Sequence, residues 1–262
     1  KKTMENWGMD TVYFEKYCDD CMGWEVTSFN VEMTAPAYMK IQAYPYAWTE
    51  SSKDVQTGDL IWIENYADLE KVKKQWSGKL QGKTVLIGSA PEQNLLFDAL
   101  SNRFTEEQIG EAEKSIVPTP SNPLSHNAGD MDLIGNLDLI FDSMVRKDDA
   151  FFAFLKVEGA KSMLGTTPFF PGVIHPSGTY NFRESDEKPI PYFAISPESF
   201  GKLKRLIDRK ITPKIKFHLD SKLYLNPKNN VNIIGEITGS DPKLKDEVVM
   251  IGAHFDSWHP AS

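Results

Sequence analysis

Apolar and polar residues alternate along this chain with two different periods, and each period predicts one kind of element. In residues 1–50 the pattern is mainly that of strands, with two β-rich runs at 11–17 and 24–33. Strict alternation at 39–43 is typical of a half-buried strand. Ahead of these runs, residues 2–7 are expected to form the end of a helix. The first section therefore resembles the edge of a larger structure.

Residues 51–210 mix both periods and are expected to form a distinct α/β module. Short apolar runs predict strands, and apolar stripes at helical spacing predict the helices between them. The expected strands cover 59–63, 84–87, 162–164 and 192–195. The expected helices cover 68–76, a stretch opened by a capping box between Thr105 and Gln108, a stripe over 133–145, and a helix that begins at Ser196-Pro197-Glu198. Loops rich in Pro, Gly, Ser and Asn are expected at 115–131 and 166–188.

The last section, residues 211–262, returns to strands. Positions 215–219 alternate between apolar and polar residues, and 231–237 is a second β-rich run. The run 247–253 is continuously apolar in its middle, which is typical of a strand buried on both faces of an α/β sheet. Three strands without an intervening helix indicate an antiparallel or mixed part of a sheet.

Composition and charge limit the class of protein. The 262 residues are enough for one large or two moderate domains, and 40% hydrophobic with 25% charged residues is an ordinary globular composition. The formal net charge of −8 argues against a nucleic-acid partner, because phosphate backbones attract basic surfaces. No apolar run approaches the roughly 18 residues of a membrane span. The chain begins Lys1-Lys2-Thr3-Met4, so we expect that a leader has been removed.

The two cysteines, Cys18 and Cys21, form a CxxC pair. A redox or zinc site with this spacing needs a thioredoxin-like context or a second pair of ligands, and the sequence offers neither. We therefore expect either a local disulfide or two free thiols in a loop. The pair alone does not fix the redox compartment.

The candidate chemistry lies directly after the last apolar run. His254 and Asp256 stand two residues apart where the expected strand ends, and open α/β sheets bind their ligands at the carboxyl ends of strands. We interpret His254 as a metal ligand, and Asp256 as the group that orients its ring or tunes a neighbouring base. The alternative is a buried His–Asp hydrogen bond without a metal, because a zinc site needs three or four converging ligands.

Two other histidines are weaker candidates. The run from His218 to Ser221 repeats the pattern of residues 254–257, but it lies in an alternating strand on the face that also carries two lysines. That face is expected to be solvated, so His218 is not expected to bind a metal. His259 is expected to be a loop residue near the site.

The run from Val248 to Ser262, VVMIGAHFDSWHPAS, resembles the first metal motif of the co-catalytic zinc exopeptidases, the family of aminopeptidase Y, carboxypeptidase Q and glutamate carboxypeptidase II. Residues 229–247 are similar to the family's approach strand and turn. Residues 58–87, 157–164 and 190–207 resemble pieces of a protease-associated domain, which is inserted into such peptidases.

This resemblance implies a fold with three parts. Residues 1–50 would be the N-terminal part of the peptidase domain. Residues 51–210 would be the protease-associated domain, a mixed β-sheet with helices and a helical insert. Residues 211–262 would be the start of the zinc-peptidase α/β sheet, which is incomplete in this chain.

For the intact enzyme, the resemblance implies a peptide substrate and hydrolysis by metal-activated water. Two zinc ions share a bridging Asp and a hydroxide, and a Glu acts as general base. The family His that matches His254 binds one zinc, and the Asp that matches Asp256 orients the site. The remaining ligands and the base would follow Ser262, so we expect this chain to be inactive alone and to bind zinc weakly or not at all. The resemblance also implies a secreted, periplasmic or cell-surface location.

Two further functions stay open. The first is a non-catalytic binding module, in which residues 51–210 shape substrate access or contact partner proteins. The second is glutaminyl cyclase chemistry, which relatives of this zinc fold perform, although those cyclases lack the inserted domain. Truncation is also expected to expose apolar sheet surface, which favours association into a homodimer.

Overall fold

The computed structural model describes residues 1–89, 103–114, 145–166, 174, 176–225 and 230–255. Within these residues the strands are β1 (Thr11–Lys16), β2 (Met22–Ala35), β3 (Met39–Lys40), β4 (Ala43–Pro45), β5 (Gln56–Ile63), β6 (Thr84–Ile87), β7 (Ser162–Gly165), β8 (Tyr192–Ile195), β9 (Lys214–Leu225) and β10 (Val231–Glu236). The helices are α1 (Lys2–Asn6), α2 (Leu69–Trp76), α3 (Glu106–Lys114) and α5 (Pro197–Asp208), and residues 145–157 are also helical. This mixture of strands and helices confirms the predicted α/β class.

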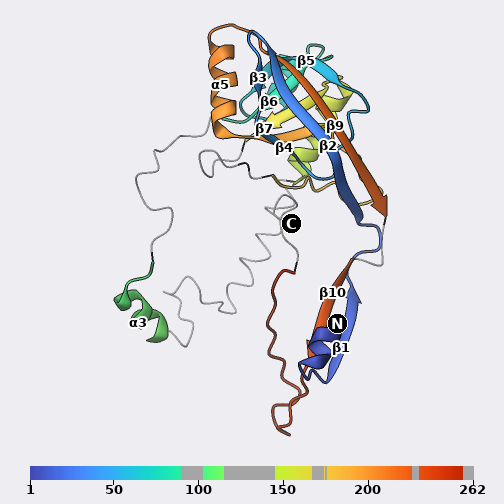
Figure 1. Ribbon diagram of the computed structural model, residues 1–262, viewed down its shortest axis with the longest axis vertical. Helices are drawn as coiled ribbons and strands as arrows, with labels where there is room; N and C mark the ends of the chain where they lie inside the picture. The colour runs from blue at the N-terminus through green and yellow to red at the C-terminus, as the bar shows by residue number, and fades with distance from the viewer. Residues whose placement is uncertain (90–102, 115–144, 167–173, 175, 226–229, 256–262) are drawn as a thin grey trace.

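Eight strands form one mixed sheet in the order β3-β2-β9-β5-β6-β7-β8-β4 (Figure 1). The strands β5 to β8 run parallel, and β9 and β4 flank them as antiparallel neighbours. The strands β3 and β4 stand at opposite ends of this order, yet three Cα steps join Lys40 to Ala43, a reach of at most ~11 Å. The two ends of the sheet therefore lie close together, and the rings of Phe29 on β2 and Tyr44 on β4 meet with centroids 5.2 Å apart.

This curling corrects the expectation of a single strand at 39–43. Residues Met39–Lys40 pair with β2, whereas Ala43–Pro45 pair with β8. Ile41 lies between the two pairings and is buried. The alternating pattern correctly predicts β structure, but it does not show that the chain changes its partner strand between residues 40 and 43.

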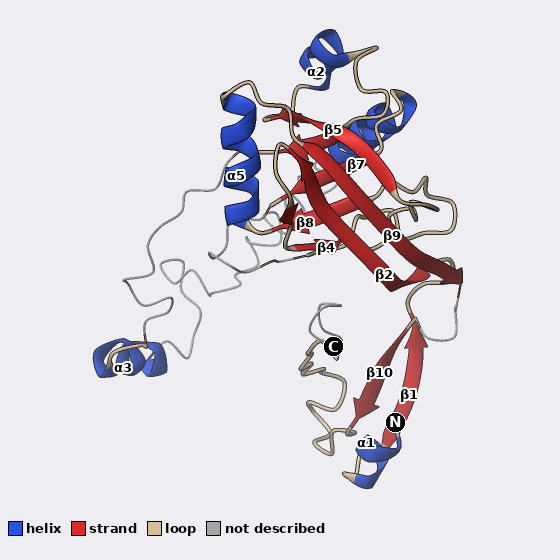
Figure 2. Ribbon diagram, turned by 45° about the horizontal axis from the view of Figure 1, so that its top comes forward, coloured by secondary structure: helices blue, strands red, loops and turns tan. Residues whose placement is uncertain are grey.

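Two buried apolar clusters pack against opposite faces of the sheet. Successive strand residues point to opposite faces, so Leu86 of β6 enters one cluster and Val85 enters the other. Helix α5 covers the first face and supplies Phe200, while α2 and the helix at 145–157 cover the second face, to which the latter supplies Phe151. Figure 2 shows α5 and α2 on different sides of the sheet. Burial of both faces explains why the short parallel strands are almost wholly apolar.

Capping hydrogen bonds mark the starts of three helices. Asp68 accepts a hydrogen bond from the Lys71 backbone N–H ahead of α2, and Ser196 accepts one from Ser199 ahead of α5, with Pro197 in the first turn. Thr105 and Gln108 exchange the two hydrogen bonds of a capping box at the start of α3. The predicted helix starts at 68, 105 and 196 are therefore confirmed. The stripe predicted over 133–145 lies outside the described residues except for its last position, which is helical.

The large sheet crosses both expected domain boundaries. It takes β2, β3 and β4 from residues 1–50 and β9 from residues 211–262, and β9 pairs directly with β5. The hydrogen-bonded unit in the described chain therefore runs from Met22 to Leu225. The assignment of 1–50, 51–210 and 211–262 to parts of a peptidase and to a protease-associated domain stays a prediction.

A second, two-stranded sheet consists of β1 and β10 in antiparallel register. It extends away from the large sheet at the end where β2 and β9 project (Figure 1). The two strands that the sequence predicted in succession, β9 and β10, thus belong to different sheets. No helix among the described residues is long and apolar enough to cross a membrane.

Candidate functional site

The segment that carries His254 is not a strand in this structure. Residues 248–254 have no regular secondary structure, and the side chains of Val248, Val249, Met250 and Ile251 are 88–95% exposed. A strand needs a neighbouring backbone for its N–H and C=O groups, and no described strand pairs with this segment. The prediction of a buried strand at 247–253 is therefore wrong for this structure, because the chain's described residues supply no layer to bury it.

His254 itself is exposed at the end of this segment. Asp256 lies outside the described residues, as does His259. Among the described residues, no two further His, Cys, Asp or Glu side chains converge on His254 at metal-ligand distance. Since zinc requires three or four converging ligands, the described residues alone do not fit a zinc ion. The roles of His254 and Asp256 stay predictions.

The one described group of metal-ligating residue types is Cys18, Asp20 and Cys21, and it is not a metal site. The two cysteines form a disulfide, so neither offers the thiolate that a metal binds. Asp20 is paired with Arg183, whose Nη1 lies 2.6 Å from the Asp20 Oδ1. Of the two expectations for the CxxC pair, the local disulfide is confirmed.

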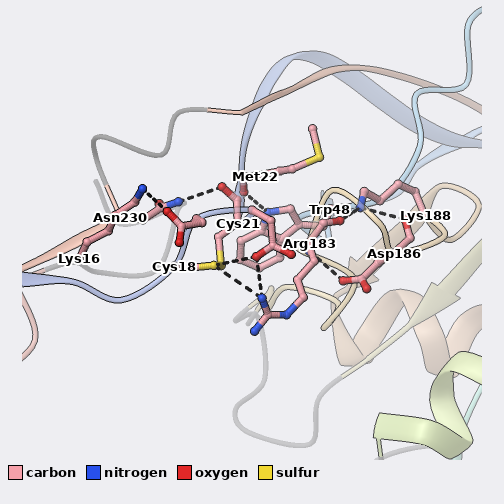
Figure 3. Close-up of a disulfide and its surroundings, with 11 residues drawn as sticks. Lys16, Cys18, Cys21, Met22, Trp48, Arg183, Asp186, Lys188 and Asn230 are labelled. Carbon is pink, nitrogen blue, oxygen red and sulfur yellow. Dashed lines mark hydrogen bonds and ion pairs between the residues drawn. A yellow bond between two sulfur atoms is a disulfide. The ribbon is translucent and has the colours of Figure 1, made fainter.

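This disulfide lies at the joint between the two sheets. Cys18 follows β1 and Cys21 precedes β2. The Cys21 carbonyl accepts a hydrogen bond of 2.9 Å from Asn230, next to β10 (Figure 3). The loop around Arg183 forms an antiparallel bridge with Cys21. The loop 17–21 therefore contacts both sheets, which gives the disulfide a structural role.

His218 is half-buried rather than fully solvated on β9. Its Nε2 lies 3.4 Å from the Ser28 hydroxyl and its Nδ1 lies 3.5 Å from the Ser52 hydroxyl. The two ring nitrogens therefore face a serine of β2 and a serine of the loop that precedes β5. The expectation of a solvated face is therefore not met at His218, and its two serine neighbours are those of a structural histidine.

A cavity that the sequence did not indicate is lined by four tyrosines and two aspartates, among other residues. It has a volume of about 230 Å³ and is lined by Tyr46, Tyr66, Tyr192 and Asp148 among others. The rings of Tyr46 and Tyr192 stack with centroids 4.0 Å apart. These residues come from four separate segments of the chain, so no local sequence pattern relates them.

Burial controls the ionisation of this cluster. It raises the pKa of Tyr46 and Tyr192, and it raises the pKa of Tyr66, to which the Asp148 charge adds. Burial also raises the pKa of Asp148, although the hydrogen bond from the Tyr66 hydroxyl opposes this. The cavity therefore holds hydroxyl groups that can donate hydrogen bonds beside a half-buried carboxyl group that can accept them.

Comparison with known proteins adds a likeness of fold. No family model matches the chain, and no curated protein sequence matches it. The structure is similar to a Peptidase M28 precursor from Shewanella amazonensis SB2B, with a TM-score of 0.52 and 12% sequence identity. The similarity covers 89% of this chain and 42% of that chain.

The chain thus shares the fold of part of an M28 peptidase precursor. It spans less than half of that protein's length, and an identity of 12% establishes the fold alone. Weaker similarities reach an aminopeptidase from Aneurinibacillus sp. strain AM-1 (TM-score 0.48, 11% identity, 92% of this chain and 42% of that chain) and the zinc aminopeptidase BSAP from Bacillus subtilis (TM-score 0.43, 12% identity, 92% and 40%).

Proposed function

We propose that this chain is part of a zinc-dependent exopeptidase that acts on peptides. The observation that carries this proposal is the fold likeness to the M28 peptidase precursor over 89% of the chain. The motif of His254 and Asp256 agrees with this proposal. By the resemblance, His254 would bind a zinc ion and Asp256 would orient the site. We propose aminopeptidase or carboxypeptidase activity for the whole enzyme, with two zinc ions.

The exposed run 248–251 supports the same proposal. Complete burial of one such side chain stabilises a protein by about 1.5–3 kcal/mol, and these four side chains are 88–95% exposed. In the whole enzyme we propose that this run enters a larger sheet, which places His254 at a strand's end. This chain covers 42% of the M28 peptidase precursor, and we propose that the remaining metal ligands lie in the part of the whole enzyme that this chain does not include. We therefore propose that the 262-residue chain alone is inactive.

The test uses the complete gene product in which this chain occurs. His254→Ala should lower hydrolysis of fluorogenic aminoacyl and carboxyl-terminal substrates by about a hundredfold or more, since even a residue that only supports a ligand is worth ~10–100-fold. The bound zinc, measured by mass spectrometry, should fall as well.

His218→Ala is the matched control, because His218 lies in the same His-x-Asp-Ser pattern on β9, and the activity of this variant should stay within about twofold of wild type. Wild-type activity after His254→Ala would contradict the proposed role of His254. Robust, chelator-sensitive hydrolysis by the 262-residue chain itself would contradict the proposed inactivity.

We also propose a secreted, periplasmic or cell-surface location. The Cys18–Cys21 disulfide supports it, because disulfides persist mainly in oxidising compartments. Mass spectrometry of the protein from its native source, after alkylation of free thiols, should find both cysteines unmodified. Two alkylated cysteines would contradict this location.

A second candidate is the non-catalytic binding module. It is favoured by the large sheet, whose two buried clusters lie within residues 26–219 and do not depend on the segment 248–255. We propose that this unit acts as a protease-associated domain that shapes substrate access. No feature of the described residues favours glutaminyl cyclase chemistry.

A further inference from the structure

The loop that joins the two sheets is closed by the Cys18–Cys21 disulfide. Residues 17–21 connect β1 of the two-stranded sheet to β2 of the large sheet. The Tyr17 backbone N–H donates to the Asn230 carbonyl oxygen at 3.2 Å. The Asn230 side-chain amide donates in turn to the Cys21 carbonyl oxygen at 2.9 Å (Figure 3). Because Asn230 directly precedes β10, these two hydrogen bonds extend the β1–β10 ladder into the loop.

The same loop is fastened to the unit of the large sheet on its other side. The Glu184 backbone N–H donates to the Asp20 carbonyl oxygen at 2.8 Å. The Met22 backbone N–H donates to the Phe182 carbonyl oxygen at 2.7 Å. The loop therefore holds the end of the small sheet against the segment 182–184, and the loop conformation decides whether all of these bonds form together.

The two-stranded sheet has few buried side chains to stabilise it. Val12 is the one buried residue of β1, and β10 has none. An isolated pair of strands is marginally stable at best in water. The large sheet differs, because its two buried clusters lie within residues 26–219 and include neither cysteine. Opening of the loop is therefore expected to weaken the small sheet and to leave the large sheet folded.

We propose that the Cys18–Cys21 disulfide is a redox-sensitive lock on the β1–β10 sheet. In the oxidised chain the S–S bond closes a ring over residues 18–21 and restricts the conformations of the loop. The stabilisation gained by closing a loop grows with its length, so this short ring adds little to the stability of the whole chain. Its effect is local, because it keeps the Cys21 carbonyl in place for Asn230. In the reduced chain the loop is free to leave this position, and the strand pair opens.

The reductant is a dithiol, and the exchange balances within the two molecules. Cys18 is only 8% exposed and Cys21 is more exposed, so a thiolate of the dithiol attacks the Cys21 sulfur. The Cys18–Cys21 bond breaks, and Cys18 leaves as a thiolate that takes up a proton. The second thiol of the reductant then attacks the mixed disulfide and releases Cys21 as the other thiol. The dithiol is oxidised to a disulfide, and its two electrons reduce the cysteine pair.

The charges beside Cys18 offset one another. Asp20 Oδ1 lies 3.4 Å from the Cys18 sulfur, and Arg183 Nη1 lies 3.9 Å from it. These two groups also pair with each other at 2.6 Å. The guanidinium therefore offsets the repulsion between the carboxylate and a leaving thiolate on Cys18.

This inference does not rest on the proposed peptidase activity. It concerns only the joint between the two sheets, which the 262-residue chain contains. An oxidising compartment keeps the lock closed, and a dithiol reductant opens it. Because β10 leads into the segment that carries His254, opening of the small sheet also loosens the attachment of that segment to the large sheet.

The test is hydrogen–deuterium exchange of the 262-residue chain with and without dithiothreitol. In the absence of denaturant the reductant should convert both cysteines to thiols, which are counted by alkylation and mass spectrometry. The backbone amides of β1 and β10 should then exchange about tenfold or more faster, while those of β6, β7 and β8 should stay within about twofold.

The double variant Cys18→Ser, Cys21→Ser should exchange like the reduced wild type, and dithiothreitol should not change it further. Asp19→Asn is the matched control in the same loop, because the Asp19 side chain is 86% exposed and the S–S bond is retained. Exposed ion pairs contribute little, so this variant should exchange like the oxidised wild type until it is reduced.

Four results would overturn the proposal. They are a disulfide that dithiothreitol reduces only in denaturant, fast exchange of β1 and β10 already in the oxidised chain, unchanged exchange after complete reduction, and unfolding of the large sheet together with the small one. The comparison of oxidised and reduced wild type stands even if the double variant does not fold.

Discussion

At the residue scale, burial sets the properties of the polar side chains more than their sequence neighbours do. Asp148 and Asp149 are adjacent in the chain, yet they face different partners, Tyr66 and Asn181. The sequence shows only two acidic residues just after the helical stripe predicted over 133–145. Their separate roles follow from helix geometry, which turns successive side chains about 100° apart.

The substitution Asp148→Asn should stabilise the protein at neutral pH. Burial raises the pKa of Asp148, so the folded chain holds this proton to a higher pH than the unfolded chain. Stability is therefore lost as pH rises from the ordinary aspartate pKa of ~4 through the raised value. Asparagine carries no charge and its amide oxygen still accepts from Tyr66. We expect a rise of about 1–3 °C in the unfolding midpoint at pH 7, measured by circular dichroism, and a smaller difference at pH 3.

The exposed carboxylate Asp246 provides the comparison for this measurement. Asp246→Asn should leave the midpoint unchanged at both pH values, since its side chain stays in water. A lower midpoint for Asp148→Asn at pH 7 would show that the charge of Asp148 stabilises the fold, contrary to the argument from burial.

At the element scale, the sequence predicts what depends on neighbours in the chain and not what depends on neighbours in space. The bounds of β6 and β8 and the starts of α2, α3 and α5 were predictable, because apolar runs and capping residues are local signals. The division of 39–43 between two sheet edges was not, because the partner strands are distant in sequence. The run 247–253 has the composition of a buried strand. A strand also needs a neighbouring strand to pair with, and none of the described strands pairs with this run.

Helix α5 offers a direct test of a local signal. Ser196 is fully buried, and its Oγ accepts from the Ser199 backbone N–H at 3.2 Å and donates to the Ser199 hydroxyl at 2.9 Å. Ser196→Ala removes the N-cap, which typically costs about 1 kcal/mol, and leaves a buried N–H without its acceptor. We expect a loss of about 1–2 kcal/mol in the free energy of unfolding, measured by urea denaturation. Ser196→Thr keeps the acceptor and should lose less, and equal losses would indicate that packing rather than capping explains the effect.

At the scale of the whole molecule, the chain combines a well-buried unit with an apolar segment that is not buried. The unit from Met22 to Leu225 contains two buried apolar clusters, one on each face of a curled sheet. The segment 248–255 presents five large apolar side chains to solvent, at Val248, Val249, Met250, Ile251 and Phe255. The fold class was predictable from the sequence, whereas the candidate metal site was not completed by the described residues. A metal site needs ligands brought together from several segments, and the sequence motif predicts only one of them, His254.

The exposed segment should make the 262-residue chain self-associate. Burial of two such side chains in an interface contributes about 3–6 kcal/mol before the costs of association. The double variant Val249→Ser, Ile251→Ser should therefore weaken association by about tenfold or more, as measured by sedimentation velocity over a range of concentrations. Val157→Ser is the matched control, because Val157 is 86% exposed but lies at the end of the helix 145–157, outside the segment 248–255, and it should associate like the wild type. A wild-type chain that stays monomeric at high concentration would show that the run 248–251 is shielded within its own molecule, and the proposal that it completes a larger sheet would lose its physical support.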